Sequence, residues 1–127
     1  MATDPDVLAG QRAAAALLSE LLAHGAAAGL PVLAWTITED GCRLVGQCRA
    51  RPHTLRAEHI TAWRSLITAA CGREPGRAGV ATLAPGQGRI LAHWDDAGAG
   101  ISVTLSAAVS ARQLGSAVTG PAELAAG

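Results

Sequence analysis

The sequence predicts a single α+β domain with the element order α-β-β-α-β-β-β, in which two helices pack on one face of a mostly antiparallel, five-stranded sheet. Three observations support this class. Two stretches repeat apolar residues at helical spacing, and most of the remaining chain alternates apolar and polar residues as half-buried strands do. The three tryptophans fall on the same side of that alternation. A chain of 127 residues fits one domain, which we expect to span residues 1–115.

The first helix is expected from the start of the chain to about Ala28. Thr3 and Asp4 can cap it, and Pro5 suits the first helical turn. Gly29 ends the helix, because glycine readily adopts a left-handed backbone. The residues at helical spacing that should face the sheet are Val7, Ala14, Leu18, Leu21, Leu22 and Gly25.

A β-hairpin is expected over residues 32–48, centred on Asp40-Gly41. This dipeptide favours a two-residue type I′ turn, in which both central residues need a positive φ. The turn and the hydrophobic alternation predict the same register, which pairs Ile37 with Leu44, Trp35 with Gly46, and Leu33 with Cys48.

A second helix is expected over residues 55–70, after a polar linker at 49–54, and Gly72 should end it. Its apolar stripe is Ile60, Trp63, Leu66, Ile67 and Ala70.

Three further strands are expected at 79–84, 89–95 and 100–107, separated by loops at 85–88 and 96–99. Pairing across these loops predicts a common helix-covered face made of Ala81, Leu83, Ile90, Ala92, Trp94, Ile101, Val103 and Leu105. Residues 116–127 are small and have little to bury, so we expect a flexible Ala/Gly-rich tail.

Several classes of function have no support in the sequence. The longest uncharged stretch, 21–38, contains glycine and proline and changes from helical to alternating spacing, so no membrane span is expected. Three irregularly spaced cysteines suggest reduced thiols in a cytoplasm. No nucleotide, hydrolase or metalloprotease motif is present, so we expect neither an enzyme nor a cofactor. His93 and Asp95 share a strand face, but no third ligand has a suitable spacing, and no metal is expected.

Charge is distributed unevenly along the chain. Ten arginines balance ten carboxylates overall, yet residues 43–77 carry a net charge of +5 and the remainder −5. Arg49, Arg51, His53 and Arg56 crowd the start of the second helix, where free backbone N–H groups and a Thr54 cap would favour an anion. Binding of nucleic acid or of a phosphate ligand at this cluster is therefore an alternative function.

The second face of the sheet has no remaining element to cover it. We expect this face to bind a protein partner or a second copy of the chain as a homodimer, which makes the protein a non-catalytic cytoplasmic adaptor or regulator. A small enzyme with an unrecognised site is a further alternative. The residues proposed for the interface are Val32, Thr36, Arg43, Val45, Val80 and Leu91.

The segment from Gly29 to Ile37, the strand that contains Leu44 and the helix that contains Ala62-Trp63 together resemble small uncharacterised actinobacterial proteins, some encoded on mobile elements. The resemblance covers residues 17–75. It implies a cytoplasmic protein from a GC-rich genome, and it implies no activity and no site residue.

Overall fold

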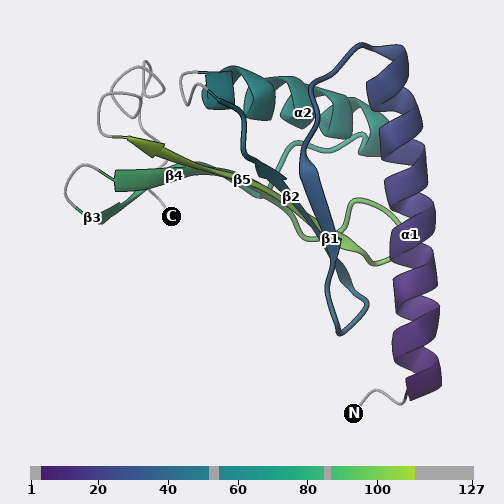
Figure 1. Cartoon of the computed structure of the whole chain (residues 1–127). Helices are drawn as coiled ribbons and strands as arrows, with labels where there is room; N and C mark the ends of the chain where they lie inside the picture. The colour runs from purple at the N-terminus through teal and green to yellow at the C-terminus, as the bar shows by residue number, and fades with distance from the viewer. Residues whose placement is uncertain (1–3, 52–54, 85–86, 111–127) are drawn as a thin grey trace.

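The computed structural model describes residues 4–51, 55–84 and 87–110, which form two helices and one five-stranded sheet (Figure 1). The predicted α+β class and element order are confirmed. The predicted tail, 116–127, lies outside the described residues. The elements are α1 (Asp4–Ala27), β1 (Ala34–Ile37), β2 (Arg43–Cys48), α2 (Arg56–Cys71), β3 (Arg77–Ala84), β4 (Gln87–Trp94) and β5 (Ser102–Ser110).

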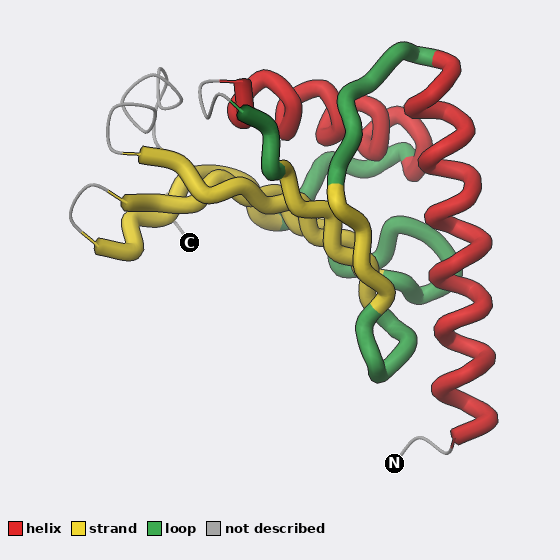
Figure 2. The backbone as a smooth tube through the Cα atoms, in the orientation of Figure 1, coloured by secondary structure: helices red, strands yellow, loops and turns green. Residues whose placement is uncertain are grey.

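The strands lie in the order β1-β2-β5-β4-β3, so the last strand in sequence is the central one. The pairs β1–β2, β3–β4 and β4–β5 are antiparallel, and β2–β5 is parallel. Strand β5 therefore joins an N-terminal hairpin to a C-terminal one (Figure 2). Both helices cover one face of this sheet (Figure 1), and we call the opposite face the outer face.

The β1–β2 hairpin has the predicted register but not the predicted turn. Trp35 pairs with Gly46 and Ile37 with Leu44, as expected. Gly41 has a φ of +77°, whereas Asp40 is not among the described residues with positive φ, so the turn is not type I′. The Thr38 N–H donates to the Arg43 carbonyl, and residues 39–42 form the loop. A loop with an even number of residues keeps every side chain on its expected face.

This loop is held by two sets of contacts. The Asp40 carboxylate accepts hydrogen bonds from the Thr38 hydroxyl and the Cys42 backbone N–H. On its other side the loop touches α1, where a Cβ atom at Gly10 would lie 2.7 Å from the Gly41 carbonyl oxygen. The helix and the loop come this close because both contacting residues, Gly10 and Gly41, lack a side chain.

The two C-terminal hairpins differ from the expected registers. In β3–β4, Val80 pairs with Ile90 and Ala81 with Arg89, so the prediction that Ala81 shares the helix-covered face with Ile90 is wrong. The cause is a loop shorter than expected, because β4 begins at Gln87, together with an irregularity between Thr82 and Ala84. In β4–β5 the register moves by two residues, which preserves the predicted faces of both strands.

Trp63 is the centre of the core. Its ring is 3% exposed and lies against Gly25 of α1, where a Cβ atom would be 2.4 Å from Cη2. Its indole N–H donates to the Pro31 carbonyl at 2.7 Å, which holds the segment between α1 and β1 beside α2 (Figure 2). Its ring also meets Trp35 edge to face, with centroids 5.5 Å apart.

The helices bury most of their predicted faces, with two exceptions. Ala14, Leu21 and Gly25 of α1 are buried, but Leu22 is 45% exposed because it lies at the edge of the apolar stripe. Helix α2 buries Ile60, Trp63 and Ile67 as predicted, but Ala70, one residue before its end, is exposed. Among the described residues, neither helix has the length and hydropathy needed to cross a membrane.

Replacing Trp63 with alanine should lower the free energy of unfolding by about 3–5 kcal/mol, because it opens a cavity shared by α1, α2 and β1. Urea denaturation measures this loss. Arg64→Ala, an exposed neighbour on α2, is the matched control and should change stability by no more than about 0.5 kcal/mol. An unchanged midpoint for Trp63→Ala would contradict the core assignment.

The Asp40 loop should make stability depend on pH in the acid range. The hydrogen bonds from Thr38 and Cys42 lower the pKa of Asp40 from 3.8 to about 2. The carboxylate therefore stabilises the fold above pH 4, and this contribution is lost as the pH falls towards 2. Asp40→Asn should be less stable than the parent at pH 6, and the difference should shrink at pH 2.5. Glu39→Gln is the control, and a pH-independent difference for Asp40→Asn would refute the interpretation.

Candidate functional site

The outer face is built from side chains that alternate with the core residues along each strand. Its central rows consist mainly of small and β-branched residues. Val45 and Thr104 are half-buried there, and Ser106 is only 5% exposed because neighbouring strands flank it on both sides. The members of the face, strand by strand, are Ala34 and Thr36; Arg43, Val45 and Gln47; Ser102, Thr104, Ser106 and Ala108; Arg89, Leu91 and His93; and Arg77 and Gly79.

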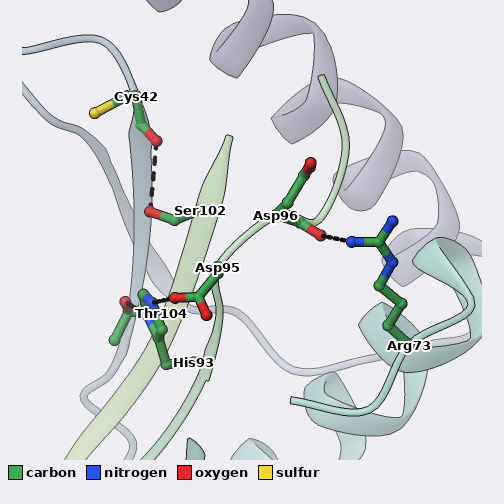
Figure 3. A network of polar contacts seen from close by, with 7 residues as sticks. All are labelled: Cys42, Arg73, His93, Asp95, Asp96, Ser102 and Thr104. Atoms are coloured by element: carbon green, nitrogen blue, oxygen red, sulfur yellow. Dashed lines mark hydrogen bonds and ion pairs between the residues drawn. The ribbon is translucent and has the colours of Figure 1, made fainter. Parts of the chain in front are cut away.

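A short chain of polar contacts lies on this face (Figure 3). His93 Nδ1 is 2.7 Å from the Thr104 hydroxyl on the adjacent strand, and His93 Nε2 is 3.1 Å from the Asp95 carboxylate. In a neutral imidazole that donates its Nε2–H to Asp95, Nδ1 accepts a hydrogen bond from the Thr104 hydroxyl. The contacts fix the orientation of the imidazole on the sheet.

A hydroxyl, an imidazole and a carboxylate in this order resemble the parts of a nucleophilic triad. Thr104 and His93 lie on strands that are paired on both sides, so their backbone N–H groups serve the sheet and are not aimed at a reacting oxygen. The Asp95 side chain is 92% exposed. The arrangement therefore favours ordering of the surface over acyl transfer.

Charged groups gather at the two ends of the outer face. At the end where β2 and β5 begin, the flanking loops carry four carboxylates, those of Glu39, Asp40, Asp95 and Asp96. At the opposite end Arg49 follows β2, and Arg89 stands on β4. Arg49 donates to the Gln47 side chain at 3.4 Å, which places its guanidinium on the outer side. Among the described residues, the ion pair found is the one between His93 and Asp95. Arg49 and Arg89 therefore have no carboxylate partner among them.

Most of the residues predicted for the interface lie on this face. Thr36 and Arg43 are exposed, and Val45 and Leu91 are half-buried. Val32 precedes β1 and is 89% exposed. Val80 differs, because the backbone register pairs it with the core residue Ile90 and not with a residue of the outer face.

Of the cluster predicted to bind an anion, the structure describes three members, and one of these, Arg56, is committed to backbone contacts. Arg56 is only 9% exposed, and its guanidinium donates to the carbonyls of Ala50 at 3.0 Å and Ala108 at 2.7 Å. Arg49 and Arg51 are exposed, while His53 and Thr54 lie outside the described residues. The N-cap of α2 is Leu55, which makes no side-chain cap. Arg56 thus ties the linker to the end of β5.

A second histidine contact lies on the helix-covered side. Cys48 Sγ is 3.7 Å from His59 Nδ1, a pairing that sequence reasoning did not identify because it depends on how α2 crosses β2. Cys48 is 1% exposed, so a substrate has no access to its sulfur atom. The pair contributes to packing beneath the start of α2.

Hollows lie beside α2 and near Asp95 in the part of the chain that the structure describes. One of about 510 Å³ lies between the end of α1 and α2, and alanines dominate its lining. One of about 180 Å³ adjoins Asp95, with Arg73 and Trp94 in its wall. Among the described residues, His93 and Asp95 gain no third histidine, cysteine or carboxylate that could complete a metal site.

The structural role of Arg56 can be tested by removing its donors while keeping its length. Arg56→Met should lower the free energy of unfolding by about 2 kcal/mol, because the carbonyls of Ala50 and Ala108 lose the charged hydrogen-bond donors of a buried guanidinium. Arg49→Met, an exposed position, should cost less than about 0.5 kcal/mol. Urea denaturation compares the two. If both variants were equally stable and only Arg56→Met lost phosphate binding, the result would contradict the structural role of Arg56 and support the predicted anion site.

Comparison with known proteins does not identify a relative. No protein-family model, no curated protein and no solved structure matches the chain. The geometry of the outer face is therefore the basis for a functional proposal.

Proposed function

We propose that this protein is a non-catalytic interaction module of the cytoplasm that self-associates through its outer face. The observation that carries the proposal is the five-stranded sheet. Both helices cover one of its faces, and no described helix covers the other. Three free cysteines, of which Cys42 is exposed, fit a reducing compartment.

The composition of the outer face supports a protein partner. Its centre holds half-buried Val45 and Leu91 among small polar residues, and arginines stand towards its margins. A weakly polar centre with a charged rim is the usual anatomy of a non-obligate interface, and arginine is enriched in such interfaces. Because no long side chain rises from the middle of β5, a second sheet can approach closely.

The size of the outer face is sufficient for a stable dimer. Five strands of four to nine residues, at about 4.8 Å between strands and about 3.3 Å per residue, give a flat area of roughly 550 Å². A pleated surface exceeds its flat projection, and a standard interface buries about 800 Å² on each partner. Two copies can therefore bury enough surface through this face alone.

A polyanion such as nucleic acid is the second candidate partner. Arg43, Arg49, Arg77 and Arg89 all belong to the outer side of the sheet, and they could contact phosphates. The tryptophans lie on the helix-covered face, so of the described residues the outer face offers the imidazole of His93 but no indole for base stacking. This candidate requires an affinity for nucleic acid that falls steeply with salt.

Val45→Arg should convert a dimeric parent to a monomer, because it places a charge in the centre of the proposed interface. Sedimentation velocity across a micromolar concentration series measures the mass, with twice the 12.8 kDa of the chain expected for the parent. Leu22→Arg, on the exposed side of α1, is the matched control and should remain dimeric.

Two results would overturn self-association. One is a parent that sediments as a monomer at high micromolar concentration. The other is a Val45→Arg variant that folds normally by circular dichroism and still forms the dimer. A variant ending at Gly115 should dimerise as the parent does, and loss of the dimer on this truncation would transfer the interface to the C-terminal residues.

A further inference from the structure

Two arginines of the outer face stand on either side of an alanine near the end of β5. Ala108 pairs directly with Arg89 on β4. On the other side of β5, the last pair that it forms with β2 joins Ala107 to Cys48. Arg49 is the next residue after Cys48 and therefore lies beside Ala108. The two arginines thus flank Ala108 in one row across three strands.

All three side chains of this row belong to the outer face. Ala108 is exposed, while both of its neighbours in β5 are buried. Arg89 directly precedes the core residue Ile90. Arg49 is exposed and donates to the side chain of Gln47, another member of the outer face. Because alanine has no atom beyond Cβ, the row has a bare stretch of sheet between its two cations.

The position of Arg49 is fixed from the helix-covered side. The Arg56 guanidinium donates to the Ala50 carbonyl at 3.0 Å and to the Ala108 carbonyl at 2.7 Å. The start of α2 accordingly lies close to the end of β5 (Figure 1). These hydrogen bonds hold the residue that follows Arg49 against β5, so the row continues past the last paired residue of β2.

The charges of the two arginines are not matched by described carboxylates. No salt bridge joins either of them to a described acidic residue. The carboxylates of the flanking loops gather at the other end of the outer face, and Glu58 belongs to α2 on the helix-covered side. Strands lie about 4.8 Å apart, so the Cα atoms of Arg49 and Arg89 are about 10 Å apart. Two long side chains can close this distance over Ala108 and converge on one anion.

We infer that Arg49 and Arg89 bind a terminal phosphate group, that of a phosphomonoester, above Ala108. Arginine presents its N–H donors in a planar fork that matches phosphate oxygens. One fork satisfies a carboxylate, whereas a phosphomonoester offers three terminal oxygens and nearly two negative charges, enough for two forks. The site differs from the cluster predicted at the start of α2, because it lies on the outer face and uses Arg89. It requires no second copy of the chain.

Titration of the protein with methyl phosphate tests this site. At pH 7.5 the ligand is mainly a dianion, because the second pKa of a phosphomonoester is about 6. At constant ionic strength, we expect saturable shifts of the backbone amide signals of Ala108 and Arg89 in NMR spectra. Arg49→Gln and Arg89→Gln should each raise the dissociation constant at least about fivefold, because each removes charged hydrogen-bond donors.

Arg43→Gln is the matched control, since it removes the same charge from the same face about 20 Å along β2 from Arg49. It should change the dissociation constant by less than about twofold. Dimethyl phosphate is a monoanion with two free oxygens, and it should bind at least about fivefold more weakly than methyl phosphate.

Three results would overturn the site. The parent could show no saturable binding, or either Arg49→Gln or Arg89→Gln could bind as tightly as the parent. Arg43→Gln could also weaken binding as much as they do, which indicates a diffuse positive field. Equally tight binding of dimethyl phosphate would overturn the choice of a terminal phosphate in favour of a phosphodiester.

Ala108→Glu gives a second test that does not remove an arginine. Its carboxylate would occupy the space between Arg49 and Arg89, so this variant should lose methyl phosphate binding while it keeps the circular dichroism spectrum of the parent. Retention of the parent's affinity would overturn the position assigned to the ligand. If Ala108→Glu does not fold, the comparison of the three arginine variants decides.

Discussion

The packing of Trp63 against a bare helix backbone is the contact on which the rest of the structure depends. One indole touches Gly25 of α1, donates to Pro31 in the connecting segment and meets the ring of Trp35 on β1. Trp35 in turn covers Gly46 of β2, where a Cβ atom would lie 2.9 Å from the ring. Two glycines therefore make room for two large rings. This pair of rings gathers both helices and the first hairpin at one point, within a core that also holds Trp94 and aliphatic residues such as Leu44 and Ile67.

The outer face is a consequence of that arrangement. Because both helices are drawn to the tryptophan side, the alternate residues of every strand are left with no described helix above them. The polar groups there are organised by short contacts such as that of His93 with Thr104, and the charges are confined to the strand ends. The proposed role in recognition rests on this surface, which is ordered in the middle and polar along its length.

Local sequence signals predicted both helices and the first hairpin because each rests on spacing or on a glycine stop. They misjudged β3, where a shorter loop and the irregularity between Thr82 and Ala84 together shift the register by an odd number, so that Val80 rather than Ala81 is in register with the core rows of β4. The site was harder to foresee. The expected β4–β5 register sets Ser102 opposite His93, and only a slip of two residues brings Thr104 there. The sequence indicated that Arg56 is a surface cation, but its guanidinium donates to the carbonyls of Ala50, in the preceding linker, and of Ala108, in β5.

The central position of β5 has a consequence for how the chain folds. The β1–β2 hairpin and the β3–β4 hairpin have no strand pairing with each other, and the strand that joins them is the last of the five in sequence. Until β5 inserts, β2 and β4 each present an unpaired inner edge, which is a template for pairing with other chains. The parallel pairing of β2 with β5 spans about sixty residues, a long-range closure that slows folding. Chains interrupted before Ser102 would thus display two open edges and no outer face, which makes them prone to aggregate.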